Sequence, residues 1–190
     1  MIIALAGFKG SGKSTAAKYL EDNYGFVRVN FKGGLIKELE QNFPDLLSYF
    51  LHLYGATDTD QLFDEKPEGV RALMMNYGTE VRRGDDEDYW VLQWKLAVAD
   101  EMMKGNKNIV VDDLRFLSEL RAVEAWRGKT VRINRDDVKQ TGNHSSETEL
   151  LFTETDFTIS TIPGDLDHLN DSLDKIMDVL EIPLCEDFRI

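Results

Sequence analysis

The segment that most constrains the fold is Gly7–Ser14, which reads Gly-Phe-Lys-Gly-Ser-Gly-Lys-Ser. It matches the pattern G-x-x-x-x-G-K-[ST]. It stands directly after the apolar run Ile2–Ala6 and directly before a segment of helical character. In this strand-to-helix setting the pattern is typical of a phosphate-binding loop, or P-loop. A flexible turn before an ordinary helix is the alternative, and the agreement of pattern and position disfavours it.

The residue types in this loop suit a nucleoside triphosphate with its metal ion. Glycines let successive backbone N–H groups point around an anion, and the helix N-terminus adds about half a positive charge. The loop lysine places a full charge at the β- and γ-phosphates, and the following hydroxyls suit Mg²⁺. We therefore expect a nucleoside triphosphate, such as ATP, and Mg²⁺ as cofactors, with Ser14 as a metal ligand. The loop alone does not separate a kinase from a GTPase, an ATP-driven motor or a regulator that only binds nucleotide. The expected cofactor-binding residues are Gly7, Lys9, Gly10, Ser11, Gly12, Lys13, Ser14 and Thr15.

Short apolar or β-branched runs alternate with helical stretches along the chain. Several runs are continuously apolar, which indicates strands buried on both faces. Strands separated by helices predict a parallel sheet, so we expect an α/β fold of the P-loop NTPase class with about five strands flanked by helices. The expected strands are Ile2 to Ala6, Phe26 to Phe31, Asn108 to Asp112, Thr130 to Asn134 and Phe157 to Ser160.

The expected helices have readable ends. Those around the sheet run from Gly12 to Gly25, from about Tyr89 to Met103, from about Leu117 to Trp126 and from about Leu166 to Leu180. Between the second and third strands lies an insertion of roughly 75 residues, too long for one crossover helix. It should contain its own helices: one starting at Leu35 to Leu39, one at Asp45 to Leu53 that Gly55 ends, and one at Gly69 to Tyr77 that Gly78 ends.

The organisation that follows is one P-loop kinase-like domain over residues 1–190. Its core should comprise about 1–34, 106–134 and 156–180. A substrate-binding helical insertion is expected over about 35–105, and a short lid over about 135–150.

A second group of polar residues follows the strand expected at Asn108 to Asp112. Asp112, Asp113 and Arg115 come at its carboxyl end, where parallel sheets bind their ligands. One carboxylate could hold Mg²⁺ or orient a substrate hydroxyl, and the arginine could contact a substrate phosphate. A solvated turn with an ion pair is the alternative. We assign the catalytic and metal role to Asp113, although the spacing leaves Asp112 open.

Other arginines are candidates for stabilising the charge at the reacting centre. Arg83 follows the Gly78-Thr79 pair, and Arg135 ends a strand where a lid could begin. A plain surface role is an equally good account of Arg28, Arg121 and Arg132. For His144 to Glu147, acid–base chemistry and a helix N-cap by Ser145 or Ser146 are both open.

Charge and composition exclude several classes of protein. The chain has 22 Lys plus Arg against 35 Asp plus Glu, a net charge of −13, so its general surface should repel nucleic acid. The lone Cys185 cannot form an internal disulfide, and we find neither zinc-ligand spacing nor a membrane-spanning run. We expect a cytoplasmic protein with no nucleic-acid or membrane partner. Whether it forms a homodimer stays open.

Taken together, the motifs resemble the bacteriophage deoxynucleoside monophosphate (dNMP) kinase family, P-loop enzymes related to adenylate and thymidylate kinases. The resemblance covers Ile2 to about Leu169. Besides the P-loop, the matching segments are Phe31 to Lys37 for F-A-x-x-[IL]-K, Arg71 to Arg83 for R-x-L-[LM]-Q-x-x-G-T-E-x-x-R, Asp88 to Trp90 for D-x-W, Asp113 to Glu119 for D-V-R-F-x-N-E, His144 to Glu147 for H-x-S-E, and Asp156 to Ile159 for D-x-x-I.

The resemblance implies a kinase that moves the γ-phosphoryl group of ATP to a dNMP and so serves nucleotide supply for DNA replication. It implies that Lys37, Arg71, Arg83 and Trp90 form the monophosphate pocket, that Asp113, Arg115 and Glu119 face it, and that Arg135 comes from the lid. Lys13, Asp113 and Arg135 are then the expected catalytic residues. Another small-molecule P-loop kinase, such as one for a cofactor precursor, and a non-catalytic nucleotide-binding regulator remain alternatives.

Overall fold

The structure is a computed structural model that describes residues 1–137, 149–150 and 152–185. The chain divides into two compact units. One comprises Met1–Asn30 and Lys95–Ile190, and we call it the sheet unit; the other is Phe31–Trp94, and we call it the helical unit. Our expected insertion, about 35–105, differs at its end, because residues 95–103 of the long helix α6 (Tyr89–Met103) belong to the sheet unit.

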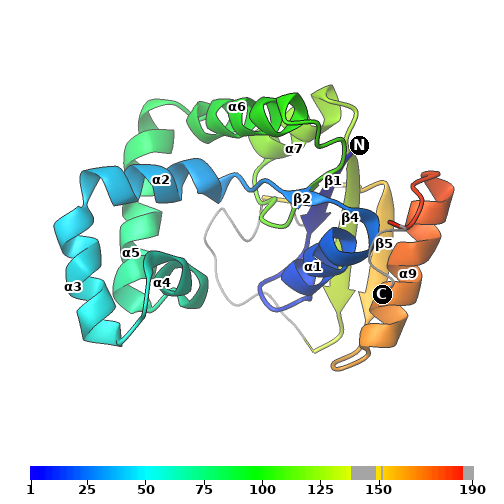
Figure 1. Ribbon diagram of the computed structural model, residues 1–190, viewed down its shortest axis with the longest axis horizontal. Coiled ribbons are helices and arrows are strands. Elements are labelled where there is room, and N and C mark those ends of the chain that lie inside the picture. Colours follow the sequence, from blue (N-terminus) through cyan, green and yellow to red (C-terminus); the bar gives the residue numbers. More distant parts are fainter. Residues whose placement is uncertain (138–148, 151, 186–190) are drawn as a thin grey trace. The chain divides into compact units, whose positions relative to one another are not determined.

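The sheet unit contains a five-stranded sheet in which all neighbouring strands of the described residues pair in parallel (Figure 1). The strand order is β2-β3-β1-β4-β5. Its strands are β1 (Ile2–Ala6), β2 (Val27–Arg28), β3 (Ile109–Val111), β4 (Lys129–Arg135) and β5 (Phe157–Thr161). All residues of β1 and β3 are buried, as a sheet covered on both faces requires. The predicted five-stranded parallel sheet is therefore confirmed.

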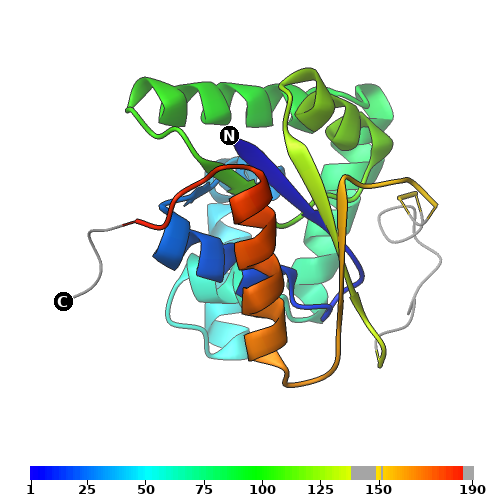
Figure 2. The same cartoon turned by 90° about the vertical axis from the view of Figure 1, so that its right-hand side faces the viewer.

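Helices cover both faces of this sheet. α1 (Lys13–Tyr24) and α9 (Leu166–Val179) lie beside the strands (Figure 2). Their buried side chains form one apolar core with Ile3, Leu5 and Val131. Side chains alternate along a strand, so Ile2 faces the other side. There, a Cβ built on Gly128 would approach both Ile2 and Val123, which belongs to α7 (Leu117–Ala125). The predicted α7 and α9 each end one residue later than the observed helices.

The helical unit has a core of its own. Its elements are α2 (Lys32–Asn42), α3 (Pro44–Tyr54), α4 (Thr59–Glu65), α5 (Glu68–Met75), the π-helix η1 (Asn76–Arg83) and the start of α6. The buried residues of this core are Leu35, Leu39, Leu47, Leu62, Phe63, Val70 and Trp90. The predicted insertion therefore contains helices of its own, and residues 31–94 pack as a separate unit.

Two local predictions in the helical unit were incomplete. α4 was not predicted, although Asp58 caps it by accepting a hydrogen bond from the Gln61 N–H at 2.8 Å. Gly78 does not end a helix as expected, because the chain continues from α5 into η1. Gly78 is buried, and a Cβ there would lie 2.9 Å from Leu35 Cδ2. The glycine therefore permits close helix packing.

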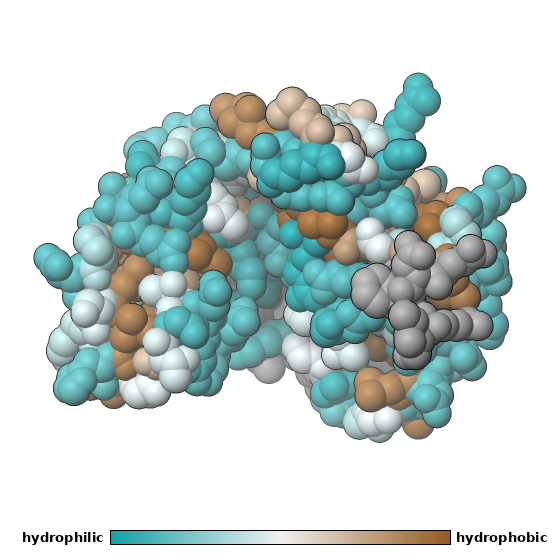
Figure 3. Space-filling model, viewed as in Figure 1, coloured by the Kyte–Doolittle hydropathy of each residue, from teal (hydrophilic) through white to brown (hydrophobic). Residues whose placement is uncertain are grey.

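Hydrophilic residues dominate the face drawn in Figure 3, in keeping with the net charge of −13. Brown apolar atoms are also visible over α3, whose Leu46 and Leu53 are exposed. Within the described residues, no helix is both long enough and apolar enough to span a membrane.

Candidate functional site: a P-loop and an acidic strand end

The loop between β1 and α1 has the backbone of a phosphate cradle. Gly7, Gly10 and Gly12 have φ angles of 139°, 82° and 105°, which side-chain-bearing residues rarely adopt. The Ser11 N–H donates to the Phe8 carbonyl oxygen at 3.1 Å and closes a tight turn. The sequence pattern therefore folds as predicted, with α1 beginning at Lys13 and ending at Gly25, whose φ of 65° forms the left-handed cap.

Lys13 is held against the loop by its own backbone. Its side chain is buried, and Nζ donates to the carbonyl oxygens of Gly7 and Phe8, each at 2.7 Å. A buried ammonium group needs such partners, since removal from water is costly. These bonds fix a positive charge at the strand-to-helix corner, beside the start of α1.

The Ser11 hydroxyl indicates what kind of ligand this loop can bind. Ser11 is 2% exposed, and its Oγ lacks a hydrogen-bond partner among the residues that the structure describes. Buried polar atoms are usually satisfied, so this oxygen suits a ligand that accepts or donates a hydrogen bond here. Together with the loop N–H groups and Lys13, it fits phosphate oxygens. The loop thus fits the nucleotide phosphates that the sequence predicted.

The donor set also fits Mg²⁺ in the way that nucleotide-binding enzymes hold it. The described part of the chain contains no cluster of three or more His, Cys, Asp or Glu residues that could hold a metal ion. Mg²⁺ is commonly bound by only one or two protein oxygens together with substrate phosphates and water. Ser14 lies exposed in the first turn of α1, and Asp113 follows the end of β3. Each offers an oxygen of the kind that such a site uses.

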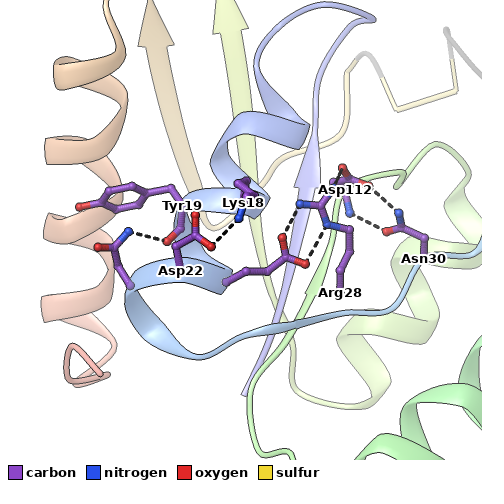
Figure 4. Close-up of polar contacts among 8 residues, drawn as sticks. Lys18, Tyr19, Asp22, Arg28, Asn30 and Asp112 are labelled. Atoms are coloured by element: carbon purple, nitrogen blue, oxygen red, sulfur yellow. Dashed lines mark hydrogen bonds and ion pairs between the residues drawn. The ribbon is translucent and has the colours of Figure 1, made fainter. Parts of the chain in front are cut away.

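Asp112 is tied into a polar network at the ends of β2 and β3 (Figure 4). Its Oδ2 accepts from Arg28 Nη1 at 3.1 Å, and its Oδ1 accepts from Asn30 Nδ2 at 2.6 Å. The Asp112 N–H in turn donates to Asn30 Oδ1 at 3.0 Å. Arg28 is also held by Glu21, with Nη2 and Oε2 2.6 Å apart. Both carboxylate oxygens are engaged, so Asp112 joins the two strands.

Glu119 has a structural role that was not predicted from the sequence. It is buried, and its Oε2 accepts from the N–H groups of Arg115 at 2.8 Å and of Phe116 at 3.1 Å. These bonds cap the start of α7 and shape the turn that carries Asp113 and Arg115. A glutamate at the third helical position was the available signal. Any contact with substrate would come in addition to this cap.

The arginines of β4 have different partners. Arg135 forms an ion pair with Asp137, with Nε and Oδ1 2.7 Å apart. Arg132 Nη2 donates to the carbonyl oxygens of Leu150 and Thr153, at 2.7 and 2.8 Å, and burial lowers the pKa of its guanidinium group. Arg132 therefore anchors the chain ahead of β5. Most of the predicted lid, including His144 and Glu147, lies outside the described residues.

The other predicted substrate residues belong to the helical unit. Lys37 on α2 and Arg71 on α5 are exposed, and Arg83 at the end of η1 is half-buried. Trp90 is buried, and its Nε1 donates to the Gly78 carbonyl oxygen at 2.8 Å. The indole N–H is thus used in packing η1 against α6. The P-loop, Asp113, Arg115 and Arg135 belong to the sheet unit.

A five-stranded parallel sheet with this glycine loop between β1 and α1 defines a P-loop nucleotide-binding protein. A solved structure supports the fold: TT1252 from Thermus thermophilus matches with a TM-score of 0.54 and 17% identity, over 95% of this chain and 97% of that one. A dephospho-CoA kinase from Campylobacter jejuni matches with a TM-score of 0.49 and 16% identity, over 95% of this chain and 97% of its own.

Sequence comparison identifies the family. The family described as deoxynucleotide monophosphate kinase matches residues 52–173. A protein of Acanthamoeba polyphaga mimivirus named "Putative deoxynucleotide monophosphate kinase" is 31% identical over 161 residues, which are 79% of this chain and 82% of that protein. The chain belongs to the deoxynucleotide monophosphate kinase family. It is accordingly a phosphotransferase whose substrates are deoxynucleoside monophosphates, and the resemblance that its motifs indicated is confirmed.

Proposed function

We propose that the chain transfers the γ-phosphoryl group of ATP to a deoxynucleoside monophosphate, with Mg²⁺, giving ADP and a deoxynucleoside diphosphate. The observation that carries this proposal is the loop itself. Lys13 is fixed over Gly7 and Phe8, beside glycines with positive φ angles and a buried Ser11 hydroxyl that has no hydrogen-bond partner among the described residues. Family membership supplies the acceptor, and the loop supplies a site for the donor phosphates.

The residues of the sheet unit then have distinct roles. Backbone N–H groups of the loop and Ser11 bind donor phosphate oxygens, and Lys13 offsets charge on the group being transferred. Ser14 and Asp113 would hold Mg²⁺, which would supply positive charge to neutralise the phosphates. Arg115 lies on the turn that Glu119 caps, from where it binds an acceptor phosphate. Arg135 supplies a further positive charge during transfer.

In the helical unit we assign acceptor binding to Lys37, Arg71 and Arg83. Their positive charges suit the dianionic phosphate of a monophosphate in an otherwise acidic chain. Trp90 acts indirectly, because its indole N–H is bonded to Gly78. We further infer that the protein acts in the cytoplasm, the host cytoplasm if a phage encodes it. Free nucleotides are its ligands, because a net charge of −13 opposes binding to nucleic acid.

The direct test is product formation. Purified protein is incubated with ATP, Mg²⁺ and each of dAMP, dCMP, dGMP and dTMP, and the nucleotides are separated by ion-exchange chromatography. We expect ADP and the matching diphosphate with at least one of the four. Parallel reactions with the ribonucleotides measure sugar selectivity, and reactions with EDTA measure the metal requirement. Absence of any deoxynucleoside diphosphate would contradict the proposal, and ADP formed without an acceptor would indicate a nucleotide hydrolase.

The two neighbouring aspartates should separate stability from activity. Asp112→Asn removes the charge that faces Arg28, so we expect the free energy of unfolding to fall by about 3 kcal/mol. Asp113→Asn should lower kcat about a hundredfold, a larger effect on activity than on stability, because we assign it to Mg²⁺. Thermal melts and steady-state rates at several Mg²⁺ concentrations check this pair. Unchanged Mg²⁺ dependence in Asp113→Asn would exclude it as the ligand.

A further inference from the structure

Three side chains of the helical unit donate hydrogen bonds to the carboxylate of a fourth. Glu38 on α2 accepts hydrogen bonds from Tyr77 and Arg82 on η1 and from Tyr89 at the start of α6; we call these four residues the Glu38 cluster. Tyr77 OH is 2.8 Å from Glu38 Oε2, and Arg82 Nη2 is 2.9 Å from the same oxygen. Tyr89 OH donates to Oε1. One carboxylate therefore joins three helices.

The Glu38 cluster is partly shielded from solvent. The Glu38 side chain is 17% exposed and that of Arg82 35%. The guanidinium carbon of Arg82 lies 5.2 Å from the ring centroids of both Tyr77 and Tyr89, within cation–π range. Burial acts to raise the pKa of Glu38, but hydrogen bonds from Tyr89 and Tyr77 and the charge of Arg82 outweigh it and lower the pKa. Glu38 is therefore ionised at neutral pH.

The contact between Tyr77 and Arg82 depends on the π form of η1. Tyr77 OH is 2.8 Å from Arg82 Nη2, although the two residues are five positions apart. In an α-helix of 3.6 residues per turn, residues five apart point about 140° away from each other. The wider π turn, with its i→i+5 bonds, brings them onto one face. The Gly84 N–H donates to the Thr79 carbonyl oxygen, which is such a bond.

The rest of η1 is held by packing. Buried Gly78 leaves no room for a side chain against Leu35, and its carbonyl oxygen accepts the Trp90 indole N–H. The start of η1 is therefore fixed at Gly78, and the Glu38 cluster fixes its end at Arg82. Each residue turns about 100° in an α-helix and less in the wider π turn. Relaxation to an α-helix would therefore rotate Arg83 away from its present direction relative to Gly78.

We infer that the Glu38 cluster is a positioning device that keeps η1 in the π form and thereby aims Arg83 at the phosphate of the dNMP. This inference rests on the proposed acceptor-binding role of Arg83. Glu38, Tyr77, Arg82 and Tyr89 are positioning residues and need not touch the substrate. π-Helical turns are rare and are frequently found at functional sites. Here the neighbouring side chains supply the restraint.

The first test compares Glu38→Gln with Glu40→Gln, an exposed position on the same helix. Glu38→Gln keeps the side-chain volume but removes the charge that holds Arg82. We expect the KM for the dNMP, and its Kd by calorimetry, to rise about tenfold while the KM for ATP stays within twofold. Glu40→Gln should change neither constant. Equal increases for dNMP and ATP, or no increase, would overturn the inference.

Coupling to Arg83 separates positioning from a general loss of structure. In an Arg83→Gln background, adding Glu38→Gln should raise the dNMP Kd by less than twofold, because the arginine that Glu38 positions is already absent. A further tenfold increase would mean that Glu38 acts independently of Arg83 and would overturn the inference. An unchanged Kd in Arg83→Gln alone would also overturn it. If the wild-type protein makes no diphosphate, the proposed activity fails, yet the calorimetric comparison still decides on positioning.

Tyrosine spectroscopy tests the cluster without substrate. Glu38 raises the pKa of the Tyr89 hydroxyl, first through the hydrogen bond between them. An ultraviolet alkaline titration of Glu38→Gln should therefore show a tyrosine ionising at lower pH than in the wild type. If Glu38→Gln does not fold, Tyr77→Phe replaces it, with the exposed Tyr49→Phe as its control. A Tyr77→Phe protein with unchanged dNMP affinity would count against the inference.

Discussion

Lys13→Met is expected to lower kcat/KM for phosphoryl transfer about 10²–10³-fold while the protein remains folded. The substitution keeps the length and apolar stem of the side chain but removes its charge from the loop. Lys13 Nζ donates to the carbonyl oxygens of Gly7 and Phe8. Loss of these two hydrogen bonds should also reduce the free energy of unfolding by about 1–2 kcal/mol. The catalytic effect should therefore far exceed the effect on stability.

Lys18→Met is the matched control on the same helix. Its ammonium group lies 2.6 Å from Asp22 in an exposed i,i+4 pair, which contributes at most about 0.5 kcal/mol. We expect its kcat/KM to stay within twofold of the wild type. Steady-state rates and thermal melts should be measured on the three proteins in parallel. A folded Lys13→Met protein with near wild-type kcat would remove this residue from the mechanism.

The sequence was most informative where local chemistry alone decides the structure. The P-loop pattern placed α1, and Gly25 and Gly55 marked helix ends, because glycine adopts positive φ without steric cost. Gly78 followed the same pattern but was assigned the wrong role. Its missing side chain makes room for Leu35, a residue more than forty positions earlier, and no local signal encodes that contact.

The site shows the same division between local and long-range information. The sequence placed Asp112 and Asp113 at a strand end but could not choose between them. The contacts of Asp112 with Arg28 and Asn30 could not be predicted from the sequence, because they depend on β2 lying beside β3. The Glu38 cluster was also missed, because the five-residue spacing of Tyr77 and Arg82 does not correspond to one face of an α-helix.

Gly7→Ala should have the largest effect on both stability and nucleotide binding. A Cβ at this position would lie 2.3 Å from the Ile133 carbonyl oxygen and 2.8 Å from Ser11 Oγ. The first atom belongs to the backbone of β4, so a side-chain rotation cannot relieve the overlap. The φ of 139° adds backbone strain. We expect the free energy of unfolding to fall by about 3–5 kcal/mol and the Kd for ATP to rise at least about a hundredfold.

Gly55→Ala separates the overlap from the backbone strain. Gly55 ends α3 with a φ of 69°, and a Cβ there meets nothing within 4 Å. Its replacement should therefore cost only about 1–2 kcal/mol, the penalty for a left-handed alanine, and leave the Kd for ATP unchanged. Urea denaturation of both variants measures the free energy of unfolding, and calorimetry measures the Kd for ATP. If Gly7→Ala proves no more costly than Gly55→Ala, the loop can move away from β4. In that case, the close approach of residue 7 to the Ile133 carbonyl oxygen would not explain why a glycine begins the phosphate cradle.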